Sequence, residues 1–336
     1  MNTELQGQEP QSQGPKFFVD IEGTIHPWSS ATITTEQIIA LGGWETSQGI
    51  IEIDKGFFGE QGQNRLRNTS AAIVGVGGVG SHIVQQCAFL GVGSISLIDG
   101  EELSETNRNR YVTCRHDDPV PGTPKVAIAE RLIKEIDPTI GVTTVQDSVV
   151  NDRAFKLVIQ SDYVFGCLDS EGARLVLTEL CAAYGRPYFD VASDIEPGDQ
   201  PGYGGRVCVA LRGESCLVCL GQLDLSEAQR ELEGPDARKS REAVYGVKAI
   251  DLGRVGPSVV SINGVVASLA ATEFMLCATG IREPRRLITY RGDFGKVLVS
   301  QDAPLPDCYY CKCVFGRRDE ADVQRYIRAG IGEFLR

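Results

Sequence analysis

The chain has 336 residues, enough for one large domain or two smaller ones. Hydrophobic residues make up 42% and charged residues 23%, the balance of an ordinary globular protein, which excludes wholesale disorder and fibrous repeats. The net charge of -12 repels phosphate backbones and anionic lipids, so we expect neither nucleic acid nor a membrane as a partner.

The N-terminal residues predict a tail followed by a small arm. Residues 1–16 are polar and Gln-rich and lack the basic start and apolar run of a secretory signal, so we expect a disordered tail on a cytoplasmic protein. Residues 17–55 place two β-prone pieces, Phe17–Ile21 and Gly49–Ile53, around a helix signal that begins at Thr34. This arm is either a small unit of its own or an extension without function.

From Ser70 onward the pattern predicts an α/β domain. Short apolar strands alternate with amphipathic helices, which indicates a doubly wound, mainly parallel Rossmann-like sheet covered on both faces. Residues 222–257 predict a long surface loop, and residues 285–299 predict two late antiparallel strands. In chain order, the other expected strands lie at 71–74, 94–99, 141–145, 163–168, 187–191 and 206–211, and the expected helices at 81–90, 125–136, 172–184, 259–279 and 317–336.

The segment from Val255 to Ile281 is the best candidate for a membrane span. It carries a single charge, Glu273, but also Pro257 and Asn263. A bilayer span needs about 20 predominantly apolar residues. We therefore favour a buried helix of the domain core over a membrane helix.

A glycine turn follows the strand at 71–74 and opens the next helix. Gly75, Gly77, Gly78 and Gly80 let the backbone approach a phosphate, and the helix N-terminus offers unpaired amides to that anion. Asp99 ends the following strand, where a carboxylate can accept hydrogen bonds from ribose hydroxyls. These features predict a nucleotide site. A nicotinamide-dependent dehydrogenase, or a structural turn without ligand, would share them.

Charged residues near this turn favour a triphosphate. The polar run from Glu101 to Arg110 ends in cations, and Lys125 opens a following helix, so that extra negative charge can be compensated. Asp169 ends the strand at 163–168 and is expected at the carboxyl edge of the sheet, where a carboxylate suits magnesium. The alternatives are a solvated loop for the cations, Arg108 among them, and a helix N-cap for Asp169.

The run from Gly75 to Arg110, with Lys125 and Cys167-Leu168-Asp169, closely resembles the ThiF/MoeB/HesA adenylyltransferases, which share their fold with ubiquitin-activating enzymes. The resemblance covers roughly residues 56–315 and implies an adenylation domain over 56–316. It implies that ATP and Mg²⁺ are used to adenylate the C-terminal carboxylate of a ubiquitin-like or sulfur-carrier protein, with release of pyrophosphate. A conjugating enzyme is a possible downstream partner. A scaffold subunit that keeps the fold without the activity is the alternative.

The resemblance also assigns roles to single residues. The four glycines would line the nucleotide turn, Asp99 would hold the ribose, and Asp169 would coordinate magnesium. Arg110, Lys125 and Asp169 are the expected catalytic residues. The full expected nucleotide site is Gly75, Gly77, Gly78, Gly80, Asp99, Glu101, Asn107, Arg110, Lys125 and Asp169.

One departure concerns the dimer that the family implies. Members often carry an Arg-Gln pair about twenty-five residues before the first strand, whose arginine reaches the partner's ATP. The corresponding residues 47–51 contain no arginine. Arg65 or Arg67 are possible substitutes. A homodimer is implied, and the arginine that would act across it is left open.

Four of the eleven cysteines predict a metal site. Cys216 and Cys219 form one C-x-x-C pair and Cys308 and Cys311 another, with the spacing that binds a tetrahedral structural zinc ion. The same pairs occur in the family. Cys313 is a competitor for the fourth position, and a redox pair is the alternative function.

No cysteine stands out as an acyl acceptor. Cys277 falls on the expected buried helix, and Cys114 lies near the phosphate-binding arginines. A hydroxyl at Ser226, Ser240 or Tyr245 is a less favoured acceptor. The arm at 17–55 faintly resembles β-grasp segments of bacterial ubiquitin-like operon proteins, and the runs at 172–177 and 257–264 resemble the activating enzymes encoded beside them.

Overall fold

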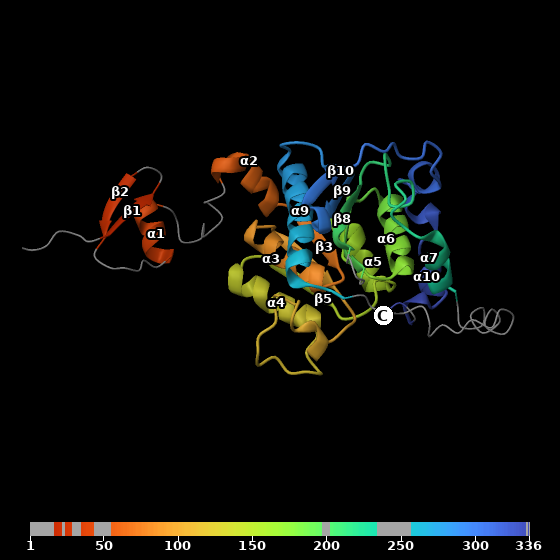
Figure 1. Ribbon diagram of the computed structural model, residues 1–336, viewed down its shortest axis with the longest axis horizontal. Coiled ribbons are helices and arrows are strands. Elements are labelled where there is room, and N and C mark those ends of the chain that lie inside the picture. Colours follow the sequence, from red (N-terminus) through yellow and green to blue (C-terminus); the bar gives the residue numbers. More distant parts are fainter. Residues whose placement is uncertain are drawn as a thin grey trace, which may run out of the picture. The chain divides into compact units, whose positions relative to one another are not determined.

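The computed structural model describes residues 17–21, 24–28, 35–43, 55–196, 202–233, 257–333 and 335. The chain divides into two compact units, Met1–Gly56 and Phe57–Arg336, whose elements are labelled in Figure 1. The β-prone piece Gly49–Ile53 and most of the expected loop 222–257 lie outside the described residues.

The N-terminal unit contains a hairpin and a helix. β1 (Phe17–Ile21) pairs antiparallel with β2 (Thr24–Trp28), and α1 (Thr35–Gly42) follows. The predicted strand and helix are confirmed. β2 was not predicted because Pro27 weakens its strand signal, yet proline is tolerated in a two-stranded edge pairing.

The second unit is built around an eight-stranded sheet with the order β10-β9-β8-β7-β6-β3-β4-β5. Five neighbouring strands, β7, β6, β3, β4 and β5, run parallel, whereas β8, β9 and β10 are antiparallel to their neighbours. The predicted doubly wound α/β fold is therefore confirmed. The strands are β3 (Ser70–Val74), β4 (Ser94–Ile98), β5 (Gly141–Val145), β6 (Tyr163–Gly166), β7 (Tyr188–Glu196), β8 (Gly202–Ala210), β9 (Leu287–Arg291) and β10 (Lys296–Val299).

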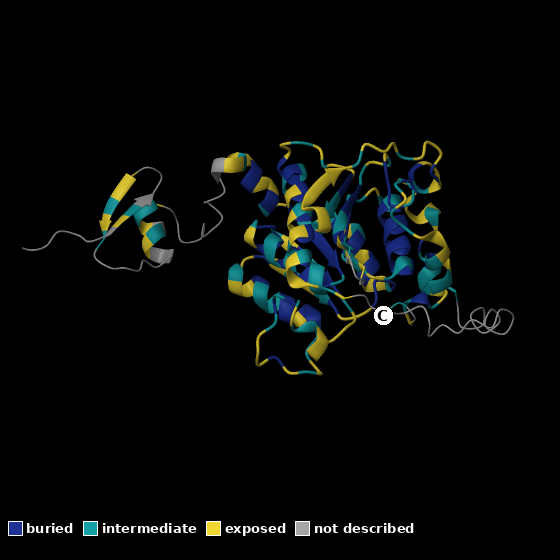
Figure 2. Cartoon of the chain, in the orientation of Figure 1, coloured by how far each residue is buried: buried dark blue, intermediate teal, exposed yellow. Residues whose placement is uncertain are grey.

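Helices cover both faces of this sheet because β3 is apolar on both. Ala71 and Ile73 belong to one buried cluster with side chains of α3 (Gly78–Phe89), α4 (Lys125–Ile136) and α9 (Val260–Thr279). Ala72 and Val74 belong to a second cluster with α5 (Asp152–Gln160) and α6 (Glu171–Tyr184). Figure 2 shows the buried residues concentrated between these layers. Such alternation is typical of a strand buried on both faces.

α9 is long and apolar enough to cross a membrane by length and composition. In the fold it packs against α3, β7 and β8, and its Glu273 is buried against Arg282, with carboxylate–guanidinium distances of 2.6 and 2.7 Å. A buried, paired carboxylate is expected in a core helix of this kind. The prediction of a core helix is confirmed.

Several elements differ from the predictions. α2 (Lys55–Arg67) and α5 were not expected, and α7 (Leu225–Glu231) interrupts the predicted loop. The expected single helix at 317–336 is wrong: three short helical turns occupy Arg318–Ala321, Arg325–Arg328 and Ile331–Glu333. The breaks fall at left-handed residues, Asp322 with φ 50° and Gly330 with φ 68°, which an α-helix does not accommodate.

Candidate functional site

The predicted nucleotide residues gather at the carboxyl edge of the parallel strands. β3 continues into Gly75, β4 into Asp99 and β6 into Cys167. The amide of Gly75 donates to the carbonyl of Ile98 at 2.9 Å, and that of Cys167 to Val74 at 2.8 Å. Three chain segments distant in sequence therefore meet at one point, as predicted for this fold.

The glycines of the turn have different structural roles. Gly75 adopts φ +84°, and a Cβ there would lie 2.4 Å from the carbonyl oxygen of Cys167. A Cβ at Gly80 would lie 1.9 Å from the oxygen of Gly75. Beyond its chain neighbours, a Cβ at Gly77 would meet no atom of the described residues within 4 Å, so these residues leave the space above it open. Gly77 is the N-cap of α3 and has no side chain to accept hydrogen bonds from the first amides of the helix. These amides can therefore donate to a bound anion.

Asp99 fixes the shape of this turn. Its Oδ2 accepts a hydrogen bond from the amide of Val76 at 2.6 Å, and its Oδ1 accepts one from Glu101 at 2.8 Å. Burial raises the pKa of Asp99, and the nearby positive charge of Lys125 opposes that rise. Each oxygen keeps a second lone pair, so the carboxylate can hold both the turn and a ribose hydroxyl.

Lys125 is a buried cation whose partner is exposed. It is the first residue of α4 and only 4% exposed, and its ammonium group is paired with the carboxylate of Glu101. The Glu101 side chain is 61% exposed. The carbonyl of Lys125 also accepts a hydrogen bond from the hydroxyl of Tyr111 at 2.7 Å. An anion that enters here can take the place of Glu101 as the counter-charge.

The two nearby arginines differ in role. Arg108 is held by the loop, because its guanidinium donates to the carbonyls of Arg115 and Asp118 at 2.9 and 2.6 Å. Arg110 donates to Thr106, and its Cδ lies 3.5 Å from the Cβ position of Gly78. Arg108 is therefore bound within its loop and is not the solvated side chain of the alternative, whereas Arg110 lies over the glycine turn.

Asn107 lies directly beside these arginines. It ends the short helical turn Glu105–Asn107, and its carbonyl accepts hydrogen bonds from the amides of Arg110 and Tyr111, both at 3.0 Å. Its side-chain amide is half-buried and makes no hydrogen bond within the part of the chain that the structure describes. The amide is therefore free to bind a ligand.

Asp169 lies in the loop between β6 and α6. Its side chain is exposed, and no hydrogen bond or ion pair engages it among the described residues. The N-cap alternative is wrong, because Ser170 caps α6: its hydroxyl accepts a hydrogen bond from the amide of Ala173 at 3.1 Å. A carboxylate free of protein partners fits a hard, oxygen-binding cation such as Mg²⁺.

Three polar residues at this edge were not predicted as site residues. Asn263, near the start of α9, is 0% exposed, and its Nδ2 lies 2.6 Å from the Cβ position of Gly78. Its Oδ1 accepts a hydrogen bond from the hydroxyl of Ser193 at 2.7 Å, and its Nδ2 donates to Ser258 at 3.0 Å. The sequence signal was an amide in a mainly apolar helix, which needs hydrogen-bond partners when it is buried.

The four predicted cysteines form one buried cluster. Their Sγ atoms all lie within 4.8 Å of one another, with Cys216–Cys308 at 3.4 Å and Cys219–Cys311 at 3.9 Å. Zn–S bonds of about 2.3 Å place tetrahedral ligand sulfurs about 3.8 Å apart, so the donor set fits zinc. Hydrogen bonds from Cys216 and Cys311 lower the pKa of Cys219. Cys313 is exposed and lies outside the cluster.

The remaining thiols show no activation. Cys277 is half-buried near Tyr163, whose position at the start of β6 is the opposite edge of the sheet from Gly75. Burial raises the pKa of the thiols at Cys87, Cys114, Cys167, Cys181, Cys208 and Cys277. A raised pKa keeps a thiol protonated and a poor nucleophile at neutral pH.

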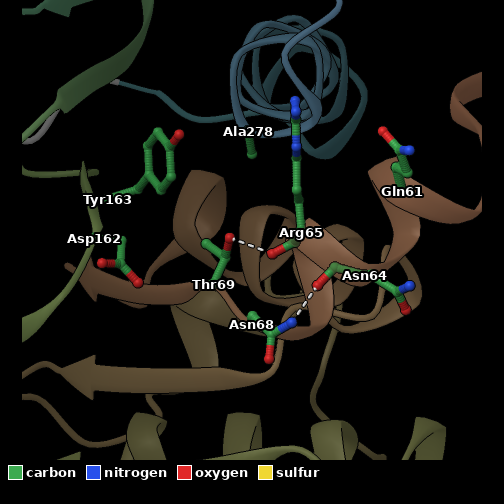
Figure 3. A pocket seen from close by; sticks show the side chains of 8 residues that line it. All are labelled: Gln61, Asn64, Arg65, Asn68, Thr69, Asp162, Tyr163 and Ala278. Carbon is green, nitrogen blue, oxygen red and sulfur yellow. Dashed lines mark hydrogen bonds between the residues drawn. The ribbon is translucent and has the colours of Figure 1, made fainter.

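An open hollow of about 580 Å³ lies at the amino ends of β3 and β6 (Figure 3). Arg65 crosses it and donates to the carbonyl of Thr279 at 2.5 Å, at the end of α9. Tyr163 and Asp162 line the other side. This hollow lies at the opposite edge of the sheet from the predicted nucleotide residues. Arg65, one candidate for an arginine acting across a dimer, is bound to α9 of its own chain.

Comparisons with known proteins agree on one family. The model of the ThiF family matches residues 52–310. Protein HesA of Leptolyngbya boryana is 29% identical over 257 residues, which cover 75% of this chain and 81% of that protein. The adenylyltransferase and sulfurtransferase MOCS3-1 of Zea mays is 26% identical over 258 residues, covering 76% of this chain and 49% of that protein.

The solved structures support the same fold. The crystal structure of E. coli MccB with ATP aligns with a TM-score of 0.57 at 20% identity, and covers 75% of this chain and 69% of that chain. The mainly parallel α/β fold described above is thus shared with a solved structure. Since the family model spans most of its length, this chain belongs to the ThiF family.

Proposed function

We propose that this chain uses ATP to adenylate the C-terminal carboxylate of a ubiquitin-like or sulfur-carrier protein and releases pyrophosphate. The observation that carries the proposal is the meeting, at one sheet edge, of an open glycine cradle, the buried ammonium of Lys125 and the carboxylate of Asp169, which no other described residue engages. The name of the maize relative and the ATP in the MccB structure support the same activity.

The chemistry needs positioning and charge compensation more than proton transfer. The attacking carboxylate is already ionised at neutral pH, so no general base is required. It forms a bond to the α-phosphorus of ATP while the bond to pyrophosphate breaks, and negative charge develops on the phosphate oxygens. Lys125 and Arg110 are proposed to stabilise that charge, and Asn107 to orient the phosphates. Bound at Asp169, Mg²⁺ would neutralise further phosphate charge.

The reaction on this chain is proposed to end at the acyl adenylate. The cysteines outside the four-cysteine cluster, apart from Cys313, have raised pKa values or are buried, which disfavours a thioester. The adenylate would then pass to another protein, either a conjugating enzyme or a sulfur donor. We further propose that the protein is a bacterial, cytoplasmic homodimer, with zinc in the four-cysteine cluster.

Exchange of radioactive pyrophosphate into ATP tests this function. We expect exchange only when a cognate carrier with a free C-terminus and Mg²⁺ are both present. Asp169→Asn should abolish it, and Asp117→Asn, which changes another exposed carboxylate, should not. Exchange without any carrier would contradict the proposal that the substrate is a protein. Tight binding of NADH without binding of ATP would overturn the proposal in favour of a dehydrogenase.

A further inference from the structure

The helix that follows Asp169 is held in place by a distant segment. The Oε2 atom of Glu231, on α7, accepts hydrogen bonds from the hydroxyl of Ser170 at 2.5 Å and from the amide of Gly172 at 2.6 Å. Ser170 and Gly172 flank the start of α6. The loop that carries Asp169 therefore ends on residues whose position depends on α7.

A buried arginine makes a second connection to the same segment. Arg174, in the first turn of α6, is 3% exposed and donates to both oxygens of Asp190 at 3.0 and 2.7 Å. Its NH2 group also donates to the carbonyl of Gln222 at 2.8 Å. Because a buried charge without partners is costly, this geometry fixes the start of α6 against both β7 and Gln222.

A third connection runs through Glu171, the first residue of α6. Glu171 pairs with Arg174, and its Oε2 accepts a hydrogen bond from the amide of Asp224 at 2.8 Å. Asp224 in turn caps α7, accepting from the amides of Ser226 and Glu227 at 2.9 and 3.0 Å. Gln222, Asp224 and Glu231 thus form one support, which we call the α6 brace.

The α6 brace begins directly after the first cysteine pair. The amide of Gln222 donates to the carbonyl of Leu217 at 2.7 Å, and that of Leu220 to Cys216 at 3.2 Å, so the turn around Cys216 and Cys219 places the Gln222 carbonyl. Cysteine turns of this type depend on their metal for a fixed fold. The position of Gln222 therefore depends on how firmly the cysteine cluster is closed.

We propose that the four-cysteine cluster positions Asp169 through the α6 brace, so that metal in the cluster strengthens binding of magnesium nucleotide at the sheet edge. This rests on the proposed function, because it takes Asp169 as the magnesium ligand. Glu231 and Arg174 are positioning residues: they touch neither nucleotide nor carrier and act through Ser170 and the start of α6. Coupling of two binding sites is reciprocal, so magnesium nucleotide also raises the affinity of the cluster for its metal.

Calorimetric titration of the full chain with a non-hydrolysable ATP analogue, with and without Mg²⁺, tests the proposal. In Glu231→Gln and Arg174→Lys we expect the Kd for the complex of Mg²⁺ with the analogue to rise about tenfold, the usual effect of losing a residue that orients a metal ligand. The Kd for the analogue without Mg²⁺ should stay unchanged. Glu227→Gln lies on the same helix, and among the described residues its carboxylate pairs with Arg230; it is the matched control and should leave both values unchanged. Equal effects with and without Mg²⁺ would overturn the proposal.

Metal removal gives an independent readout. In an equilibrium competition with a chromogenic chelator, the zinc affinity of the cluster should rise several-fold when the magnesium–analogue complex is saturating, and the Glu231→Gln variant should lose this gain while still binding zinc. An unchanged zinc affinity in wild type would overturn the proposal. If zinc-loaded wild type binds no ATP analogue at all, the proposed function fails, which is a separate outcome from loss of coupling.

Discussion

The amide of Val76 donates to Oδ2 of Asp99 at 2.6 Å, and this bond joins the glycine turn to the end of the neighbouring strand. The residue expected to contact the nucleotide sugar is therefore also the residue that shapes the phosphate turn. A substitution at Asp99 should affect folding and nucleotide binding together, whereas changes elsewhere in the site should affect them separately.

Asp99→Asn replaces one acceptor oxygen with a donor that faces a backbone amide. We expect a loss of about 1.5–3 kcal/mol in the free energy of unfolding, the usual value for a hydrogen bond to a charged group, and weaker binding of ATP. Urea unfolding and calorimetric titration measure the two effects. Unchanged stability with weakened ATP binding would show that the Val76 bond contributes little to the fold.

Gly80→Ala and Gly77→Ala separate the structural and binding roles of the turn. A Cβ at residue 80 meets backbone 1.9 Å away, so we expect a lower melting temperature, or failure to fold. A Cβ at residue 77 meets, beyond its chain neighbours, no atom of the described residues within 4 Å but enters the proposed phosphate space. That variant should melt like wild type and bind ATP at least tenfold more weakly. Normal ATP affinity in Gly77→Ala would place the phosphates elsewhere.

Lys125→Met tests the buried cation, because Met fills a similar volume without charge. We expect the rate of pyrophosphate exchange to fall about 10²–10³-fold, the cost of removing one donor that stabilises transition-state charge. Glu101→Gln removes only the exposed counter-charge and should change the rate far less. Similar losses in both variants would indicate that the ion pair itself, and not the free ammonium group, supports the reaction.

Asn263→Asp places a negative charge beside Gly78. If phosphates occupy the glycine cradle, repulsion should weaken ATP binding more than tenfold, and more strongly as pH rises and the new carboxylate ionises. Ser193→Ala removes one hydrogen bond to Asn263 without adding charge and should cost only about 1 kcal/mol of stability. Fluorescence titration at two pH values compares the variants, and equal ATP affinities for both would argue against phosphate near Asn263.

Asp118 should make the free energy of unfolding depend on pH in the acidic range. Hydrogen bonds from Arg131, at 2.5 and 2.9 Å, are the main cause that lowers the pKa of Asp118 to about 2. A folded pKa below the unfolded value of about 3.8 stabilises the fold above pH 4, and that contribution is lost as pH falls towards 2.

The matching variant is Asp118→Asn. Its free energy of unfolding should lie below that of wild type at pH 7, and this difference should narrow as pH falls from about 4 towards 2. Urea unfolding over this range measures the difference. If the difference in the free energy of unfolding does not change with pH, the stabilisation by Asp118 comes from hydrogen-bond geometry and not from its charge.

Local patterns explain what the sequence predicted well. The glycine turn, Asp99 and the two C-x-x-C pairs are short motifs whose spacing is tied to backbone geometry, and each lies where the fold was expected to bring it. The parallel order of the sheet follows from the alternation of strands and helices.

Residues joined by tertiary contacts were not predictable in the same way. Asn263 meets Ser193 only because β7 extends beyond its parallel neighbour and α9 packs on it, across 70 residues of chain. Ser170, and not Asp169, became the cap of α6, a difference of one residue that no propensity decides. The prediction of a single C-terminal helix was wrong because Asp322 and Gly330 adopt left-handed backbone conformations. Between them, the ion pair of Arg325 with Glu179 holds the chain against α6.

Cys313 is a site for selective chemical labelling. Its thiol faces solvent two residues after Cys311, whose own thiol is enclosed with the cluster. A maleimide dye should therefore attach first at Cys313 while the cluster is closed, and further equivalents should react once a chelator opens it. A single fluorophore at this position would report opening of the cluster in real time, without any substrate.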